Sequence, residues 1–242
     1  MNRVIVLTGA SRGLGLALAK KFIASGDTVF GISRTRTHWT AAKKAVSSDR
    51  FQLLSGDITS EKTVKTIVAG ILRRAGRVDL LLNNAGYCGP LTRVEALSLA
   101  EFRKHLKGNL LIPFLMCQAV LPIMLKQKHG LILNVSSMAG TRAVPRLFAY
   151  SAAKSGVLAL SQAIAKENLD TGIKCVTVCP GGMNTAMRQK LFGAEDAARQ
   201  QTAEFMADMI AQVAEGKIEV LSGGHIVIRH GKITGIFPPP AA

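Results

Sequence analysis

A glycine-rich turn between an apolar run and an amphipathic helix constrains the fold of this chain more than any other stretch. The apolar run Arg3–Leu7 predicts a short buried strand, and it leads directly into Thr8-Gly9-Ala10-Ser11-Arg12-Gly13-Leu14-Gly15. The residues that follow, up to Ser25, predict a helix. Glycines let the backbone approach a diphosphate, and a helix N-terminus presents free N–H groups to it. The spacing Gly-x-x-x-Gly-x-Gly departs from the commoner Gly-x-Gly-x-x-Gly, and a plain tight turn is the alternative interpretation.

Short apolar runs and helical segments alternate along the rest of the chain. This alternation predicts an α/β fold in which a parallel sheet is covered by helices on both faces. The length of 242 residues and the absence of repeats or linkers predict one domain over residues 1–242. The further strands that we expect are Thr28–Ser33, Phe51–Ser55, Asp79–Leu82, Gly130–Val135, Lys174–Cys179 and a last strand at Ile226–Ile228. The further helices are expected at Thr63–Ala75, Ser98–Leu125, Phe148–Leu169 and, as one or two helices, Ala194–Ala214.

The end of the second expected strand bears on the choice of dinucleotide. NAD-binding units usually place an acidic residue at this point, whereas an arginine accommodates the 2′-phosphate of NADP. The chain has Ser33-Arg34 here and no acid, and Arg12 adds a second cation in the glycine-rich turn. We therefore expect NADP(H) rather than NAD(H), with two ordinary surface arginines as the alternative.

Tyr150 and Lys154 stand four residues apart in a predicted helix, so both lie on one helix face. An ammonium roughly 4 Å from a phenol contributes about 4 kcal/mol at an effective dielectric near 20, enough to lower the phenol pKa by up to about three units. This would make Tyr150 a general acid or base near neutral pH. An ordinary amphipathic helix with a lysine that extends to solvent is the alternative.

The composition describes a soluble globular protein with an unusually high formal charge of +16. Lysines and arginines are scattered and only 5% of residues are aromatic, so we do not expect nucleic acid as the primary ligand.

The uncharged run Leu110–Leu125 is interrupted by two prolines, and we expect a buried helix and no membrane span. Met1 is followed almost at once by an apolar run, so no leader peptide is expected. No Cys/His spacing fits a metal site, and four thiols that are most simply buried and reduced suit a cytoplasmic location.

Several motifs in this order and spacing closely resemble the short-chain dehydrogenase/reductase family over almost the full length of the chain. The motifs are Thr8-Gly9-x-x-x-Gly13-x-Gly15, Asn83-Asn84-Ala85-Gly86, Asn109, Ser137, Tyr150-x-x-x-Lys154 and Pro180-Gly181. Ser137 precedes Tyr150 by thirteen residues. The last strand departs from the family, because it reads Ile228-Arg229-His230-Gly231-Lys232 where the family often has Asp-Gly-Gly.

The resemblance implies a three-layer Rossmann-type fold with a doubly wound, seven-stranded parallel sheet, and a catalytic tetrad. In the tetrad, Tyr150 would donate a proton to a carbonyl oxygen, Ser137 would hydrogen-bond that oxygen, Lys154 would hold the nicotinamide ribose, and Asn109 would support a water relay. Asp57 would contact the adenine, Asn84 the ribose region and Thr185 the carboxamide. The complete set of expected cofactor-binding residues is Gly9, Ser11, Arg12, Gly13, Leu14, Gly15, Ser33, Arg34, Asp57, Ile58, Asn84, Ala85, Gly86, Tyr150, Lys154, Pro180, Gly181 and Thr185.

These expectations describe an NADP(H)-dependent oxidoreductase that reduces a ketone or 3-oxoacyl substrate, free or linked to an acyl carrier. Arg142 and Arg146 lie in the loop before the tyrosine helix, as contacts to an anionic substrate or as solvated loop charges. Residues 187–205 are a candidate substrate lid, and the resemblance suggests a homodimer or homotetramer. A catalytically silent dinucleotide-binding regulator and a polyanion-binding protein remain as alternatives.

Overall fold

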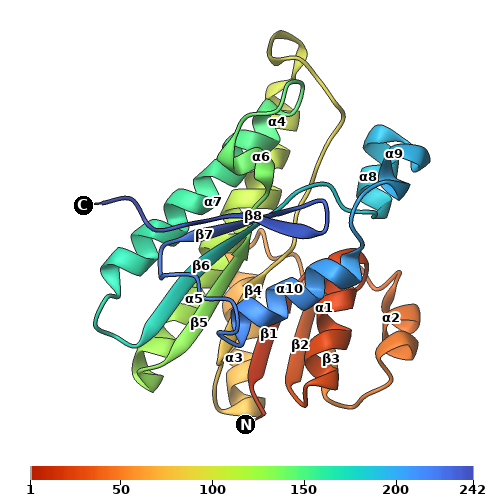
Figure 1. Cartoon of the computed structure of the whole chain (residues 1–242). Coiled ribbons are helices and arrows are strands. Elements are labelled where there is room, and N and C mark those ends of the chain that lie inside the picture. The colour runs from red at the N-terminus through yellow and green to blue at the C-terminus, as the bar shows by residue number, and fades with distance from the viewer. Residues whose placement is uncertain (1, 242) are drawn as a thin grey trace.

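Eight strands form one sheet in the computed structural model, which describes residues 2–241. The strands follow the order β3-β2-β1-β4-β5-β6-β7-β8 (Figure 1). Strands β1 to β7 are all parallel, so the expected doubly wound parallel sheet is confirmed. The strands are β1 Val4–Thr8, β2 Thr28–Ser33, β3 Phe51–Ser55, β4 Leu80–Asn83, β5 Gly130–Val135, β6 Ile173–Pro180, β7 His225–Arg229 and β8 Lys232–Phe237.

The eighth strand was not expected from the sequence. β8 pairs antiparallel with β7 and covers the edge at which the predicted seven-stranded sheet would end. His230 and Gly231 connect the two strands with φ angles of 52° and 71°. Two consecutive residues with positive φ are typical of the tight turns that join antiparallel strands. The segment after Ile228 therefore continues the sheet before the chain reaches its proline-rich end.

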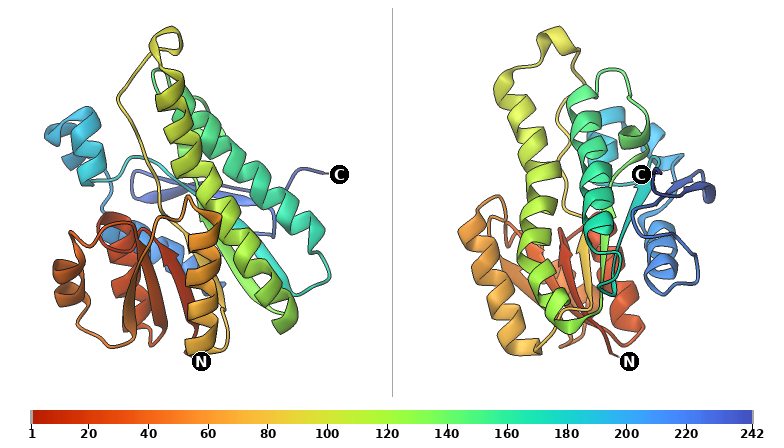
Figure 2. Two further views of the ribbon diagram at one scale, coloured as in Figure 1. Left: turned by 180° about the vertical axis from the view of Figure 1, so that it is seen from behind. Right: turned by 90° about the vertical axis from the view of Figure 1, so that its left-hand side faces the viewer.

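Helices cover both faces of the sheet, because alternate strand residues point to opposite sides (Figure 2). Ile5 and Leu7 join the core on one face, and Val4 and Val6 join the core on the other. The first core includes residues of α1, α2 and α10, and the second includes residues of α3, α5 and α7. The helices are α1 Gly13–Ala24, α2 Trp39–Val46, α3 Glu61–Ala75, α4 Leu99–Leu106, α5 Ile112–Gln127, α6 Met138–Thr141, α7 Phe148–Glu167, α8 Ala186–Phe192, α9 Ala194–Ala198 and α10 Ala203–Ala214, and η1 at Val94–Ala96 is a 3-10 turn.

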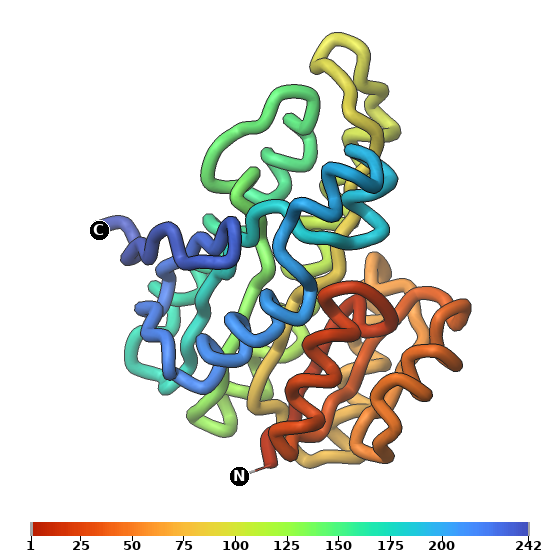
Figure 3. The backbone as a smooth tube through the Cα atoms, turned by 45° about the vertical axis from the view of Figure 1, so that its right-hand side comes forward, coloured from red at the N-terminus to blue at the C-terminus, as the bar shows by residue number. Residues whose placement is uncertain are grey.

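The strand order reverses between β1 and β4, and ligands of open parallel sheets bind beyond the carboxyl ends of the strands at such a point. The glycine-rich turn follows β1 at this end of the sheet. The segment that contains α8 and α9 lies beyond the same end (Figure 3). This segment includes most of the candidate lid at 187–205.

Helices α4 and α5 run on from each other through a π-helical turn, η2 Lys107–Leu111. The prediction of one helical region is confirmed, but sequence periodicity does not indicate its π turn. By length and composition the continuous stretch Leu99–Gln127 could cross a bilayer, with a mean hydropathy of 1.8 over its most apolar window. Because 44% of that window is buried in the protein, and core helices of soluble proteins pass the same test, this stretch carries no argument for a membrane.

Candidate active site

The glycine-rich turn has the conformation that its glycines permit. Gly9 and Gly13 have φ angles of 73° and 52°, a region in which residues with a side chain are strained. A side-chain carbon on Gly15 would overlap the carbonyl oxygen of Gly9 and lie 2.7 Å from Nδ2 of Asn84. The turn is therefore as close to the end of β4 as backbone packing allows.

The N-terminus of α1 is free to bind an anion. Its N-cap residue, Arg12, makes no side-chain hydrogen bond to the helix. Among residues 2–241 no acceptor pairs with the backbone N–H groups of Gly13, Leu14 and Gly15, because the first backbone hydrogen bond joins Leu16 to Arg12. Free N–H groups at a glycine-rich helix start fit a dinucleotide diphosphate. The predicted phosphate-binding residues are thus together in a geometry that suits them.

The end of β2 lies beside this turn. The hydroxyls of Ser11 and Ser33 are 3.1 Å apart, which joins the turn to the last residue of β2. Arg12 and Arg34 are both exposed next to this pair. Asp57 is also exposed, and hydrogen bonds from Thr59 hold the pKa of its carboxyl below the usual range. Ile58, in contrast, is 6% exposed and belongs to the core, so its side chain packs rather than projecting into the site.

The residues after β4 connect the dinucleotide side of the site to the catalytic side. Thr8 Oγ1 accepts hydrogen bonds of 3.0 Å from the backbone N–H groups of Asn84 and Ala85. A side-chain carbon on Gly86 would lie 3.1 Å from Oδ1 of Asn109 and 3.7 Å from Nζ of Lys154. Asn109 and Lys154 therefore flank the same glycine.

Asn109 is fully buried within the π turn, and its side chain holds the loop after β4. Its Oδ1 accepts from the N–H of Tyr87 at 3.0 Å, and its Nδ2 donates to the carbonyl oxygens of Tyr87 at 2.7 Å and His105 at 3.0 Å. π turns occur often at functional sites. Asn109 thus fixes the backbone beside Gly86, in addition to its expected role in the tetrad.

The three remaining members of the tetrad lie beside the end of β5. Lys154 is 3% exposed, and its Nζ donates a hydrogen bond of 2.8 Å to the carbonyl oxygen of Val135, the last residue of β5. The carbonyl oxygen of Lys154 accepts a bond of 2.8 Å from Ser136 Oγ. Ser137 begins α6 and accepts from the N–H of Ala139 at 3.1 Å. These contacts bring Ser137 and Lys154 to one end of the sheet, and Tyr150 lies one helical turn before Lys154 in α7.

The sequence predicts that Lys154 lowers the pKa of Tyr150, and this prediction is wrong in this structure. Burial raises the pKa of the Tyr150 hydroxyl, the nearby thiol of Cys88 adds to this, and Ser137 opposes it. The ammonium of Lys154 lies 5.9 Å from the centre of the tyrosine ring. Burial also lowers the pKa of Lys154 to about 8, so the lysine loses part of the charge that would act on the phenol.

The strand β6 contributes the remaining predicted residues. Pro180 ends this strand, and the N–H of Gly181 donates a bond of 2.7 Å to Ile228 in β7. Thr185 caps α8 through a 3.3 Å bond from the N–H of Arg188. Its methyl group would lie 3.9 Å from a side-chain carbon on Gly13, so Thr185 lies over the glycine-rich turn.

Sequence reasoning missed a polar and aromatic group next to Tyr150. The ring of His105 stands edge-on to that of Tyr150, with centroids 6.4 Å apart and planes at 73°. The ring of Tyr87 is tilted by 57° against that of His105, with centroids 5.1 Å apart, and its hydroxyl donates a hydrogen bond to Glu101. The available signal was the spacing of Glu101, His105 and Asn109, which puts the three on one helix face.

The cysteines differ in part from the expectation. All four are free, and Cys117, Cys175 and Cys179 are buried as expected. Cys88 is only half-buried, and desolvation raises the pKa of its thiol to about 11. It lies in the loop that Asn109 holds.

The family model for short chain dehydrogenase matches residues 3–196. The chain belongs to this family. It is 36% identical over 199 residues to 2-(R)-hydroxypropyl-CoM dehydrogenase of Xanthobacter autotrophicus, with 78% of each chain covered. It is 32% identical over 190 residues to L-fucose dehydrogenase of Mus musculus, with 78% of this chain and 68% of the relative covered.

Solved structures of short-chain dehydrogenases have the same fold. Levodione reductase superposes with a TM-score of 0.88 at 28% identity, covering 95% of this chain and 96% of that structure. ElxO with NADP bound superposes with a TM-score of 0.88 at 26% identity, covering 96% of this chain and 98% of that structure. A 3-ketoacyl-(acyl-carrier-protein) reductase from Brucella melitensis, complexed with NADH, superposes with a TM-score of 0.87 at 25% identity, covering 95% of this chain and 97% of that structure. A short-chain dehydrogenase is an oxidoreductase that uses NAD(P)(H), and these neighbours include both forms of the cofactor.

Proposed function

We propose that this short-chain dehydrogenase is an NADP(H)-dependent reductase of ketones or 3-oxoacyl compounds, free or linked to an acyl carrier. The proposal depends on one observation above all, the meeting of Ser137, Tyr150 and Lys154 at the end of β5, beside Gly86 and Asn109. The 3-oxoacyl option is supported by the similarity to the 3-ketoacyl-(acyl-carrier-protein) reductase from Brucella melitensis.

The four tetrad residues have distinct tasks in this proposal. Tyr150 gives its hydroxyl proton to the carbonyl oxygen, and a raised pKa keeps that proton in place until a carbonyl accepts it. Ser137 hydrogen-bonds the same oxygen. Lys154, with a pKa near 8, exists in both protonation states around neutral pH and can return a proton toward Tyr150. Asn109 keeps the loop beside Gly86 in position. The bound nicotinamide supplies the hydride.

Arg34 supports NADP(H) over NAD(H). It follows the last residue of β2, is exposed, and lies beside the Ser11–Ser33 hydrogen bond and the free N-terminus of α1. A guanidinium pairs with a phosphate through two parallel hydrogen bonds, whereas the hydroxyl of NAD offers it no charge. Arg12 is a second cation close to the same point.

The reaction is tested by following NADPH absorbance with a panel of ketones, diketones and acyl thioesters. We expect substrate-dependent loss of NADPH with at least one class. Tight NADPH binding without oxidation by any compound would contradict the proposed reduction and favour a silent dinucleotide-binding regulator.

The cofactor choice is tested with Arg34→Asp, and Arg36→Asp is the matched control. Arg36 is also exposed in the same loop, but its guanidinium lies over the ring of Trp39 at 5.3 Å. Loss of a charge-assisted phosphate contact should move the NADP/NAD ratio of kcat/KM toward NAD by about 10- to 100-fold. The control should keep the ratio of the unmodified protein. An unchanged ratio in Arg34→Asp would reject Arg34 as the selecting residue.

A further inference from the structure

The N-terminus of α7 is the second long helix start next to the site that lacks a cap. Its N-cap residue, Leu147, makes no side-chain hydrogen bond, and within residues 2–241 no acceptor pairs with the N–H groups of Phe148, Ala149 and Tyr150. The chain caps α3, α4 and α10 with Ser60, Ser98 and Thr202. A helix of 20 residues with free N–H groups favours an anion at its start.

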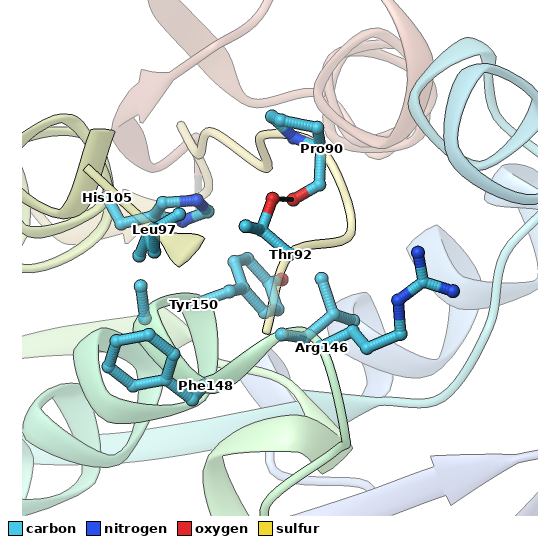
Figure 4. Close-up of a pocket in the computed structure, with 9 residues that line it drawn as sticks. Pro90, Thr92, Leu97, His105, Arg146, Phe148 and Tyr150 are labelled. Carbon is cyan, nitrogen blue, oxygen red and sulfur yellow. Dashed lines mark hydrogen bonds between the residues drawn. The ribbon is translucent and has the colours of Figure 1, made fainter. Parts of the chain in front are cut away.

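A buried histidine without a hydrogen bond at its Nδ1 faces this helix start. His105 is 2% exposed, and its Nδ1 has no partner within the described part of the chain. Its ring lines a cavity of about 10 Å³ with Tyr150 and the other first-turn residues of α7 (Figure 4). A buried polar atom that makes no hydrogen bond is unfavourable, and a bound ligand could supply the partner that His105 Nδ1 lacks here.

Arg146 lies at the edge of the same cavity. It precedes α7, lines the cavity, and also lines an adjoining open groove of about 530 Å³ with Arg93, Val94, Glu95 and Pro145. Figure 4 shows that its side chain begins at the cavity and that its guanidinium extends away from Tyr150, where Nη2 donates to the carbonyl oxygen of Leu91. In the described residues no carboxylate pairs with Arg146, whereas Arg93 is paired with Glu95.

The backbone of Arg146 is held in a conformation that arginine rarely adopts. Its φ is 65°, and hydrogen bonds fix it to the facing loop, from the N–H of Thr92 to its carbonyl oxygen at 2.9 Å and from its Nη2 to the carbonyl oxygen of Leu91 at 3.3 Å. The left-handed region is unfavourable for a residue with a side chain. Backbone strain of this kind is concentrated at binding sites.

We propose that this cavity binds a carboxylate of the carbonyl substrate, with Arg146 as the residue that selects it. The inference rests on the proposed function, because the carboxylate would lie beside the Tyr150 hydroxyl that serves the carbonyl group. A space of about 10 Å³ is the size of one water molecule and therefore of one carboxylate oxygen. Arg146, the first-turn N–H groups and His105 supply the donors. The substrate class is a short oxo acid, and its remaining atoms extend into the groove.

The test compares pyruvate, acetoacetate and levulinate with their methyl esters as substrates of the protein with NADPH. The three acids place the carboxylate at three distances from the carbonyl group, and each ester removes the charge and adds one methyl group. We expect the best acid to exceed its ester in kcat/KM by about tenfold or more, the range of a charge-assisted hydrogen bond. Equal rates for all three acid–ester pairs would overturn the inference while leaving carbonyl reduction intact.

Arg146→Gln should raise KM for the preferred acid by about tenfold and change KM for its ester by no more than about twofold. Arg142→Gln is the matched control, since Arg142 is an exposed arginine in the same loop that lines neither the cavity nor the groove. His105→Phe keeps an aromatic ring but removes the ring nitrogens. It should lower kcat/KM for the acid more than for the ester. An equal effect of Arg142→Gln and Arg146→Gln would attribute the preference to net charge and reject the site.

A binding measurement separates this inference from the proposed reaction. Calorimetry on Tyr150→Phe loaded with NADPH measures binding of the same acids without turnover. Binding that Arg146→Gln weakens in that background supports the site even if no compound is reduced. Binding that is indifferent to Arg146 overturns it, whatever the turnover assays show.

Discussion

Burial decides the charge states of Tyr150 and Lys154. The spacing of the two residues predicts that they share a helix face, and Lys154 does lie 5.9 Å from the ring of Tyr150. The sign of the pKa shift of Tyr150 could not be predicted from spacing, because it depends on how much protein surrounds each group. Desolvation raises the pKa of the phenol and lowers that of the ammonium.

Lys154 should therefore titrate near pH 8 rather than near 10.5. The measurement is a pH titration of side-chain nitrogen resonances in lysine-labelled protein, with Lys154→Met to identify the signal. The unfolded chain holds this proton more tightly than the folded chain does. The free energy of unfolding should therefore decrease as pH falls from 10.5 through 8. A midpoint above 10 would contradict the effect of burial.

The unpaired Nδ1 of His105 is a residue-scale feature that the sequence could not indicate. A lone histidine in an amphipathic helix is most simply a surface or core residue. Its place beside Tyr150 depends on how α4 packs against α7, which brings the two rings to 6.4 Å. That packing is a tertiary property.

At the scale of elements, the glycine-rich turn is the part most fully predicted by the sequence. Its glycines, the apolar run before them and the helix after them all appear where expected. The reason is local, since positive φ at Gly9 and Gly13 and the close approach at Gly15 follow from residue type.

Gly15→Ala should destabilise the protein by about 1–3 kcal/mol, because the added carbon would overlap the Gly9 carbonyl oxygen. Gly70→Ala is the control. Gly70 lies within α3, where an added carbon would meet only the end of Arg73 at 3.9 Å, and this change should stabilise by about 0.5–1 kcal/mol. Urea unfolding measures both. If Gly15→Ala left the free energy of unfolding unchanged, the turn would have to relax around the added carbon.

Strand β8 and the π turn were not predicted from the sequence, for different physical reasons. The turn at His230 and Gly231 carried a signal, because histidine tolerates positive φ and glycine favours it, and Ile233 follows at strand spacing. The π turn around Asn109 carried none. An extra residue in one turn leaves the composition of a helix unchanged and is fixed by the bonds of Asn109 to the backbone of Tyr87 and His105.

At the scale of the whole molecule, the strand order and helix layers follow from the alternation of apolar runs with helices. Strands buried on both faces need a helix on each side, and parallel connections provide them. The formal charge of +16 plays no part in that architecture. It acts on the stability of the folded state as a whole.

Self-repulsion among 31 basic and only 15 acidic side chains should make the protein more stable as salt increases. Raising sodium chloride from about 10 mM to about 150 mM shortens the Debye length from about 30 Å to about 8 Å. We expect Tm to rise over this range, and a matched series in potassium chloride should give the same curve. A fall in Tm would mean that the ion pairs on the surface outweigh the repulsion.

The central claim is that the Tyr150 hydroxyl donates the proton in an NADPH-dependent reduction, and Tyr150→Phe tests it most directly. The variant keeps the ring that packs against His105 and removes only the proton. We expect NADPH binding, measured by fluorescence titration, to stay within about twofold, and kcat with the best substrate of the panel to fall by about 100-fold or more. Turnover close to that of the unmodified protein would contradict the account.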